Sequence, residues 1–246
     1  MFTDKTLWLI GANSDISSCF AKNYCNKFGH VVLASKNIEN TQKMQRENSL
    51  TNTSIFYIDL TDIQSIETFM SQAPKPFGVI FFAGFTDYID KSENNSDSNI
   101  INTVAVNYLS PMIMIEKISK EMRDKGNGFV ALLSSAGEIR GKYSNRFYVS
   151  SKCAITAYLE GIMQKNEKHS VKTMIFKMGH IDTKMLKKLG KSRKPLFVAS
   201  PDIASEFLFK HIQKQKSTIK YFRPIWKLLA AVYKALPLQL YKQLDI

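Results

Sequence analysis

Residues 6–16 read Thr-Leu-Trp-Leu-Ile-Gly-Ala-Asn-Ser-Asp-Ile, an apolar run that passes through Gly11 into a polar segment. Residues 6–11 predict a short buried strand, and residues 14–28 predict a helix. Gly11 lets the chain turn sharply between the two elements. Such a turn exposes backbone N–H groups at a helix N-terminus, which suits a pyrophosphate. An ordinary strand–helix turn explains a single glycine equally well.

The alternation of strand and helix continues along the chain. Further apolar runs predict strands at residues 30–35, 54–58, 77–82, 129–133 and 171–177. Helical patterns cover, among others, residues 98–124, 146–168 and 201–215. Ser200 is a suitable N-cap for the last of these, with Pro201 at its first position. Strands without polar alternation indicate a parallel sheet covered on both faces. We therefore predict an α/β fold with one doubly wound, Rossmann-type parallel sheet.

Composition narrows the class of protein. Of 246 residues, 44% are hydrophobic, so the chain can bury a sizeable core. Cys19, Cys25 and Cys153 are odd in number and lack metal-ligand spacing, which argues against a disulfide framework and a metal site. The N-terminus lacks the layout of a signal peptide, and no apolar run approaches the length of a membrane span. We expect a cytoplasmic protein.

The net charge of +13, from 34 basic and 21 acidic residues, favours anionic partners. From Lys184 to Lys194 there are six basic residues and no acidic one, and from Lys210 to Ile246 there are eight basic residues against Asp245 alone. Excess lysine also serves solubility. A nucleic-acid binder is suggested by this charge only, and no recognition motif supports it.

The ends of the second and third strands indicate which nucleotide could bind. An NAD site usually places a carboxylate after the second strand to bind the ribose 2′-hydroxyl. Here that carboxylate is missing and Lys36 is available, a cation that tolerates the 2′-phosphate of NADP; the alternative is a solvated lysine. Asp59 and Leu60 follow the third strand. Asp59 could accept from an adenine amino group or cap the next helix.

Candidate acid/base residues lie at and after the end of the fifth predicted strand. Ser135 ends this strand, and Tyr148 follows thirteen residues later. Lys152 is four residues beyond Tyr148, so the two side chains share one helix face. An ammonium group beside a phenol lowers the phenol pKa and makes it usable as an acid/base near neutrality. Taken alone, the pair could equally be an exposed feature of a helix surface.

Together these residues resemble the classical short-chain dehydrogenases/reductases over about residues 5–222. The order and spacing of the features carry the resemblance. They are the Gly11 turn, Asp59, Ala83-Gly84, Asn107, Ser135, Tyr148-x-x-Ser-Lys152, Gly179 and Thr183.

The resemblance implies an NADP(H)-dependent oxidoreductase that interconverts a ketone and a secondary alcohol. Tyr148 would transfer the proton, Lys152 would lower its pKa and bind the nicotinamide ribose, Ser135 would bind the substrate oxygen, and Asn107 would hold a relay water. The implied cofactor site consists of Gly11, Asn13, Ser14, Asp15, Ile16, Lys36, Asp59, Leu60, Ala83, Gly84, Tyr148, Lys152, Gly179, Ile181 and Thr183. Such proteins are usually homo-oligomers.

The chain departs from the family pattern at several positions. Asp15 and Ser17 stand where the glycine-rich turn usually has two further glycines, and Phe81-Phe82 replaces Asn-Asn. Met178 replaces the proline before Gly179. Because the glycine-rich turn is altered, a second function stays open: a catalytically idle regulator that binds NADP. The intact Asn107, Ser135, Tyr148 and Lys152 set argues for an enzyme.

Two basic segments bear on the substrate. Residues 180–195, where the family places its substrate lid, suit a phosphorylated substrate such as a nucleotide- or lipid-phosphate-linked keto-sugar, or form a solvated helix face. Residues 224–242 predict an amphipathic helix with apolar side chains at 225, 228, 229, 232 and 236. It could contact the inner face of an anionic membrane or a second subunit. We divide the chain into a catalytic domain, residues 1–222, and a tail, residues 223–246.

Overall fold

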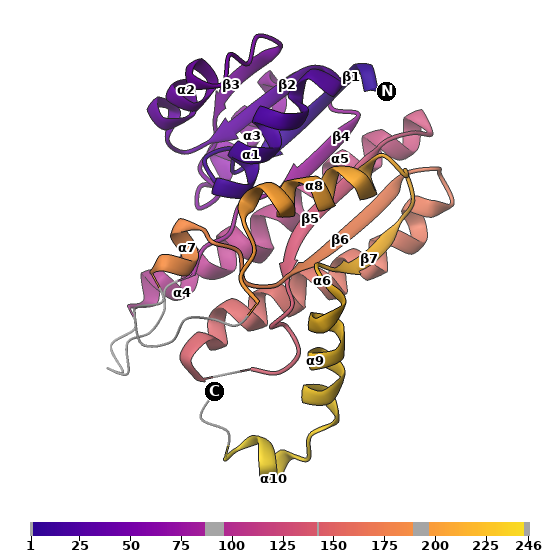
Figure 1. Ribbon diagram of the computed structural model, residues 1–246. Helices are drawn as coiled ribbons and strands as arrows, with labels where there is room; N and C mark the ends of the chain where they lie inside the picture. Colours follow the sequence, from indigo (N-terminus) through magenta and orange to yellow (C-terminus); the bar gives the residue numbers. More distant parts are fainter. Residues whose placement is uncertain (1, 87–95, 142, 189–196, 244–246) are drawn as a thin grey trace.

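Seven parallel strands form one sheet in the order β3-β2-β1-β4-β5-β6-β7 (Figure 1). The computed structural model describes residues 2–86, 96–141, 143–188 and 197–243. The strands are β1 (Phe2–Ile10), β2 (Phe28–Ser35), β3 (Thr53–Tyr57), β4 (Gly78–Phe81), β5 (Phe129–Ser135), β6 (Lys172–Met178) and β7 (Thr218–Tyr221). This order reverses direction between β1 and β4, as in a doubly wound fold, so the predicted fold class is confirmed.

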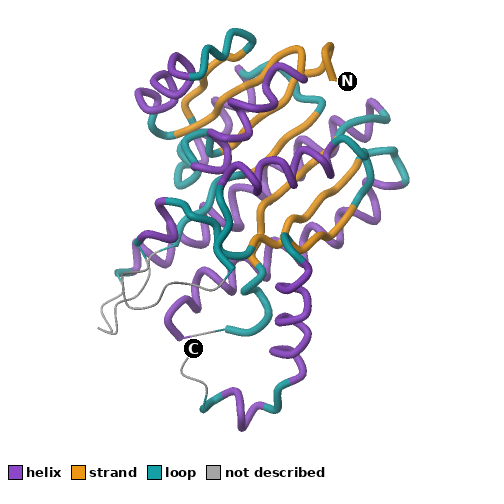
Figure 2. Tube along the Cα trace, viewed as in Figure 1, coloured by secondary structure: helices purple, strands orange, loops and turns teal. Residues whose placement is uncertain are grey.

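Helices cover both faces of the sheet (Figure 2). The α-helices are α1 (Asp15–Tyr24), α2 (Ile38–Glu47), α3 (Ile63–Gln72), α4 (Asp97–Val104), α5 (Ser110–Lys125), α6 (Arg146–Glu167), α7 (Lys184–Lys187), α8 (Pro201–Ile212), α9 (Pro224–Ala235) and α10 (Leu238–Tyr241). The described residues also form three shorter helical segments. These are the 3₁₀ helix η1 (Cys25–Lys27), the π-helical turn η2 (Ala105–Leu109) and the 3₁₀ helix η3 (Tyr143–Asn145).

Alternate residues of each central strand enter two separate cores. Leu7 and Leu9 of β1 pack with apolar residues of α1, α2 and α8 on one face. Trp8 and Ile10 pack with α3, α5 and α6 on the other. Because both faces are buried, the central strands need no polar residues, which explains their continuous apolar sequence.

The predicted elements differ from the observed ones mainly at their ends. Strand β1 begins at Phe2, whose ring stacks on Phe28 with centroids 5.0 Å apart. The short edge strand β7 was not predicted, because its four residues include an exposed lysine and no fully buried side chain. Ser200 caps α8 as predicted, accepting from the Ile203 N–H. Residues 87–95 lie outside the described residues, and α4 begins at Asp97, one residue before the predicted start of the helical pattern at 98–124.

The C-terminal amphipathic helix is present as α9 but is shorter than predicted. It ends at Ala235, seven residues before the predicted end at Lys242. Pro237 disfavours helical geometry at Leu236, which is extended (ψ 129°), and the chain restarts as α10. No helix within the described ranges combines the length and the apolar character needed to cross a bilayer.

Candidate active site

A cavity of about 470 Å³ opens beyond the carboxyl ends of the central strands. This is where open α/β sheets bind their ligands. Twelve of the predicted site residues line it: Asn13, Ser14, Asp15, Ile16, Ala83, Gly84, Ser135, Tyr148, Lys152, Gly179, Ile181 and Thr183. Five others do not line it: Gly11, Lys36, Asp59, Leu60 and Asn107. The strand ends therefore gather most of the predicted residues into one site.

Lys152 is buried beside Tyr148 on α6. Its side chain is only 3% exposed, and its ammonium lies 5.8 Å from the centre of the Tyr148 ring. The ammonium donates a hydrogen bond to the Leu133 carbonyl at 3.1 Å. Burial lowers the pKa of Lys152 to about 8, although the charge of Glu138 opposes this shift. The site thus holds a lysine that can change its charge near physiological pH.

Asn107 lies in the π-helical turn η2, and its side chain contacts the backbone of the segment that follows β4. Its amide oxygen accepts from the Phe85 N–H at 2.9 Å, and its amide nitrogen donates to the Phe85 carbonyl at 2.7 Å. A Cβ added to Gly84 would lie 3.7 Å from the Asn107 amide oxygen and 3.9 Å from the Lys152 ammonium. The Asn107 side chain therefore anchors the segment after β4, close to Lys152.

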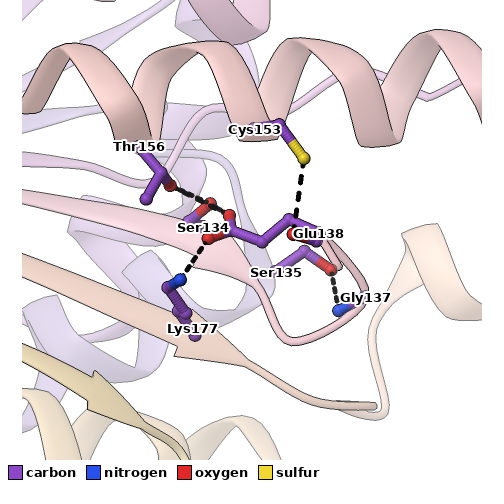
Figure 3. A network of polar contacts seen from close by, with 7 residues as sticks. All are labelled: Ser134, Ser135, Gly137, Glu138, Cys153, Thr156 and Lys177. Atoms are coloured by element: carbon purple, nitrogen blue, oxygen red, sulfur yellow. Dashed lines mark hydrogen bonds and ion pairs between the residues drawn. The ribbon is translucent and has the colours of Figure 1, made fainter. Parts of the chain in front are cut away.

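A buried carboxylate, which sequence reasoning missed, supports the turn after Ser135 (Figure 3). Glu138 accepts hydrogen bonds from the Ser134 hydroxyl and, at 2.9 Å, from the Thr156 hydroxyl of α6. Its other oxygen pairs with the Lys177 ammonium of β6 at 2.7 Å. Burial disfavours the charge on Lys177, but the hydrogen bond and charge of Glu138 outweigh it and raise the Lys177 pKa.

This network connects β5, α6 and β6, and its member Ser134 also lines the cavity. Ser135 itself accepts from the Gly137 N–H at 3.1 Å, which orients its hydroxyl within the turn. The Cys153 thiol donates to the Glu138 carbonyl at 3.3 Å. Glu138 lies three residues after Ser135, but only the fold shows that it pairs with Lys177.

The turn after β1 packs closely against the backbone that follows β4. Gly11 has a φ of +85°, and a Cβ there would lie 2.6 Å from the Ala83 nitrogen, so only glycine fits. Ser14 caps α1 by accepting from the Ser17 N–H. The Asn13 amide donates to the Asn37 carbonyl at 2.7 Å, which ties the turn to the end of β2.

The two replaced glycines have different environments. Asp15 accepts a hydrogen bond from the backbone N–H of Lys184 at 2.6 Å, so it connects α1 to α7 across the cavity. The Lys184 ammonium lies 3.8 Å from the same carboxylate. Ser17 is fully buried, and its hydroxyl has no hydrogen-bond partner among the described residues.

The Lys36 ammonium pairs with Asp59 at 2.5 Å, outside the cavity. The hydrogen bond with Asp59 raises the pKa of Lys36. Burial would raise the pKa of Asp59, but hydrogen bonds from Lys36 and Thr61 lower it. Asp62, not Asp59, caps α3. The Lys36 side chain remains largely exposed, so it stays accessible to an anion at the end of β2.

The tail supplies part of the cavity wall, which the sequence did not indicate. Trp226 of α9 lines the cavity and packs edge-on against the His180 ring, with centroids 5.0 Å apart. A Cβ on Gly179 would lie 1.9 Å from the indole nitrogen, so Trp226 rests directly on the backbone there. Farther along, the Tyr241 hydroxyl of α10 donates to the Gly141 carbonyl at 2.5 Å.

The predicted basic lid is described only in part. Lys184 and Lys188 line the cavity, while Lys187 pairs with Asp182 at 3.6 Å. The remaining basic residues, Lys191, Arg193 and Lys194, lie outside the described residues.

Comparison with known proteins identifies the family. Residues 5–194 match the family model described as short chain dehydrogenase, so the chain belongs to this family of oxidoreductases. It is 23% identical over 231 residues to the fatty acyl-CoA reductase of Acinetobacter baylyi, covering 87% of this chain and 75% of that protein. It is also 23% identical over 213 residues to the levodione reductase of Leifsonia aquatica, covering 83% and 79%.

Solved structures show the same fold. A short chain dehydrogenase from Burkholderia cenocepacia in complex with NADP superposes with a TM-score of 0.83 at 17% identity, covering 100% of both chains. A short-chain dehydrogenase from Sphingobium yanoikuyae in complex with NADPH gives 0.80 at 12% identity, covering 98% of this chain and 96% of that one.

Proposed function

We propose that the chain is an NADP(H)-dependent oxidoreductase that interconverts a ketone and a secondary alcohol, with Tyr148 as the proton-transferring residue. The observation that carries this proposal is the buried Lys152 ammonium beside the Tyr148 ring, in a cavity that Ser135 also lines. A buried cation next to a phenol favours the phenolate and so adapts tyrosine for acid/base work.

The residues present fit a dinucleotide. The N-terminus of α1 lies at the cavity wall, where a helix dipole and first-turn N–H groups suit a pyrophosphate. The N–H groups of Gly11 and Ala12 instead donate to the Ala34 carbonyl and fix the turn. The residue that follows β2 is Lys36, not a carboxylate that would repel a 2′-phosphate. This favours NADP(H) over NAD(H). Asp15 departs from this pattern, because its carboxylate adds negative charge near the turn. The nicotinamide would supply or accept the hydride.

The protein residues would then handle the oxygen and its proton. In reduction, the Tyr148 hydroxyl donates its proton to the carbonyl oxygen, while the Ser135 hydroxyl donates a hydrogen bond that orients that oxygen. Lys152 stabilises the resulting phenolate by its charge and binds the nicotinamide ribose. Asn107 keeps the segment after β4 in place and contributes to the proton relay. In oxidation, the same groups act in the reverse direction.

The test is the substitution Tyr148→Phe, which removes only the acidic hydroxyl. We expect most turnover of any accepted ketone to be lost, by 10²-fold or more as an order of magnitude, with NADPH binding nearly unchanged in a fluorescence titration. Turnover close to wild type in this variant contradicts the mechanism. A wild-type protein that binds NADPH but reduces none of a panel of ketones and keto-sugars is instead the idle regulator.

For the substrate, we propose a keto-sugar, in a phosphorylated or lipid-phosphate-linked form. The support is the basic rim of the cavity, where Lys184 and Lys188 lie among its lining residues. Self-association, cytoplasmic location and a domain boundary at residue 222 stay predictions.

We also propose that the tail contacts an anionic membrane. On α9 and α10, Leu228, Val232, Leu238 and Leu240 are each more than half exposed. Residues 223–243 contain no acidic residue, and Lys227 and Lys234 are exposed on α9. Apolar side chains flanked by lysines suit a headgroup layer, with about 1 kcal/mol of attraction for each basic residue.

Because Trp226 belongs to the cavity, truncating the tail would confuse membrane binding with catalysis, so point variants are the better test. The double variant Leu228→Asp and Val232→Asp should abolish salt-sensitive binding to phosphatidylserine liposomes. Ile101→Asp, at an exposed apolar residue of α4, is the matched control and should bind as wild type does. If the double variant instead dissociates an oligomer and wild type ignores liposomes, this face is a subunit interface.

A further inference from the structure

The carboxylate of Glu138 joins the two elements that carry the proposed catalytic residues. Ser135 ends β5, and Tyr148 lies on α6. The Glu138 carboxylate accepts one hydrogen bond from the Ser134 hydroxyl of β5 and another, at 2.9 Å, from the Thr156 hydroxyl of α6 (Figure 3). One side chain from the turn after β5 therefore connects the strand to the helix.

Both bonds are close in sequence to the proposed catalytic residues. Ser134 directly precedes Ser135. Thr156 follows Lys152 by four residues and Tyr148 by eight, so these three side chains share one face of α6. The hydroxyls of Ser134 and Thr156 are also 3.1 Å apart. A shift of α6 relative to β5 would therefore change these contacts and the positions of the catalytic groups together.

The Glu138 side chain is fixed in place. It is only 2% exposed, and its second carboxylate oxygen pairs with the Lys177 ammonium of β6 at 2.7 Å. Its backbone N–H donates to the Ser135 carbonyl at 3.3 Å, so the turn is held at both ends. Moving any one of these elements would leave a buried charge or hydroxyl without its partner, which is costly.

Stability alone does not require a charge at this place. Val130 and Leu132 of β5 and Ile155 and Leu159 of α6 already share one apolar core. A buried ion pair contributes little to stability compared with apolar side chains of similar volume. Hydrogen bonds are directional, however, so the carboxylate adds a fixed geometry that apolar packing does not supply.

We propose that Glu138 is a positioning residue that sets the location of Ser135 relative to Tyr148, so that both hydroxyls reach one carbonyl oxygen. This inference rests on the proposed function and identifies a further residue that serves it. Glu138 does not line the cavity, so it acts through Ser134 and Thr156. Proton transfer requires groups within hydrogen-bond reach, and a displacement of about 1 Å can lower the rate about a hundredfold.

The first test uses isosteric variants of two buried threonines. Thr156→Val removes the hydroxyl that binds Glu138, and it should lower kcat for an accepted ketone about tenfold while NADPH binding in a fluorescence titration stays as in wild type. Thr156→Ser keeps the hydroxyl and should retain most of the wild-type kcat. Thr173→Val is the matched control, because the Thr173 hydroxyl of β6 accepts from the Asn166 amide at 3.0 Å, near the C-terminal end of α6. This control should lose stability but keep the wild-type kcat.

The second test removes the carboxylate without leaving a buried charge. The double variant Glu138→Leu and Lys177→Met replaces the ion pair by apolar side chains, an exchange that is often neutral or stabilising. Its urea unfolding midpoint should lie near or above that of wild type, whereas its kcat should fall about a hundredfold.

The outcomes separate this inference from the proposed function. The inference is overturned by a wild-type kcat in Thr156→Val or in the folded double variant, or by a loss of kcat in Thr156→Ser or Thr173→Val as large as that in Thr156→Val. If the double variant does not fold, the three threonine variants decide. A wild type that does not bind NADPH, or reduces no ketone, overturns the proposed function and the inference with it.

Discussion

Replacing Lys152 by methionine should stabilise the fold while it removes activity. The Lys152 ammonium is buried and has one hydrogen-bond acceptor among the described contacts, the Leu133 carbonyl. Burial lowers its pKa from 10.5 to about 8. At about 1.4 kcal/mol for each pKa unit, this shift corresponds to a cost of about 3 kcal/mol for keeping the charged form folded. Losing the bond to Leu133 offsets part of the gain, so we expect a net gain of about 1–3 kcal/mol at pH 7.

The pH dependence gives the sharper test, because it cancels the packing differences between lysine and methionine. Below pH 8, Lys152 is protonated in both the folded and the unfolded chain, and its full cost is present. Between about pH 8 and 10.5, the folded state has released the proton while the unfolded state still holds it. Wild-type stability relative to Lys152→Met should therefore rise through this interval.

The assay is urea unfolding of both proteins without cofactor, at pH 7 and at pH 9.5. The advantage of Lys152→Met should shrink by about 2 kcal/mol between the two values. Turnover of an accepted ketone by Lys152→Met, measured in parallel, should be lost. A variant less stable than wild type at pH 7, or a difference that does not change with pH, would refute the reasoning.

Three further predictions concern other buried or paired groups. Ser17→Ala removes a fully buried hydroxyl that has no hydrogen-bond partner in the described part of the chain, and it should raise the free energy of unfolding by about 1 kcal/mol in urea titrations. Lys36→Ala should weaken NADPH binding about tenfold and change NADH binding little, as measured by fluorescence titration; equal losses for both cofactors contradict the assignment. Glu138→Gln leaves Lys177 without its carboxylate and should lower stability by about 3 kcal/mol at pH 7. Because the pKa of Lys177 is raised, this difference should diminish as the pH rises beyond 10.5.

The central strands of the sheet could be predicted because a strand buried on both faces has a continuous apolar sequence. Strand β4 is buried at every position and reads as an unbroken apolar run. Strand β7 has no such run, since it lies at the edge of the sheet and half of its residues are exposed. Only its pairing with β6 in the folded sheet identifies it as a strand.

The proximity of Tyr148 and Lys152 could be predicted for a similar reason. Tyr148 and Lys152 are four residues apart on one helix, so their spacing in the sequence alone places them on the same helix face. Trp226 illustrates the opposite case. The spacing of apolar residues in the tail shows that one helix face needs cover, but not which surface covers it. That Trp226 meets Gly179 depends on the path of the chain after β7, and no local pattern encodes it.

The contribution of Trp226 to the cavity has a consequence for the order in which the site forms during synthesis. The six strands β1 to β6 and the residues Ser135, Tyr148 and Lys152 all precede residue 194 in the chain. At about 5–20 residues per second, the ribosome needs a further interval of about 2–9 s to reach Tyr241 of α10. At the start of that interval the chain contains Ser135, Tyr148 and Lys152 but lacks α8, which belongs to one of the two cores, and Trp226, which supplies part of the cavity wall. The cavity wall at Trp226 is therefore the last part of this site to be made.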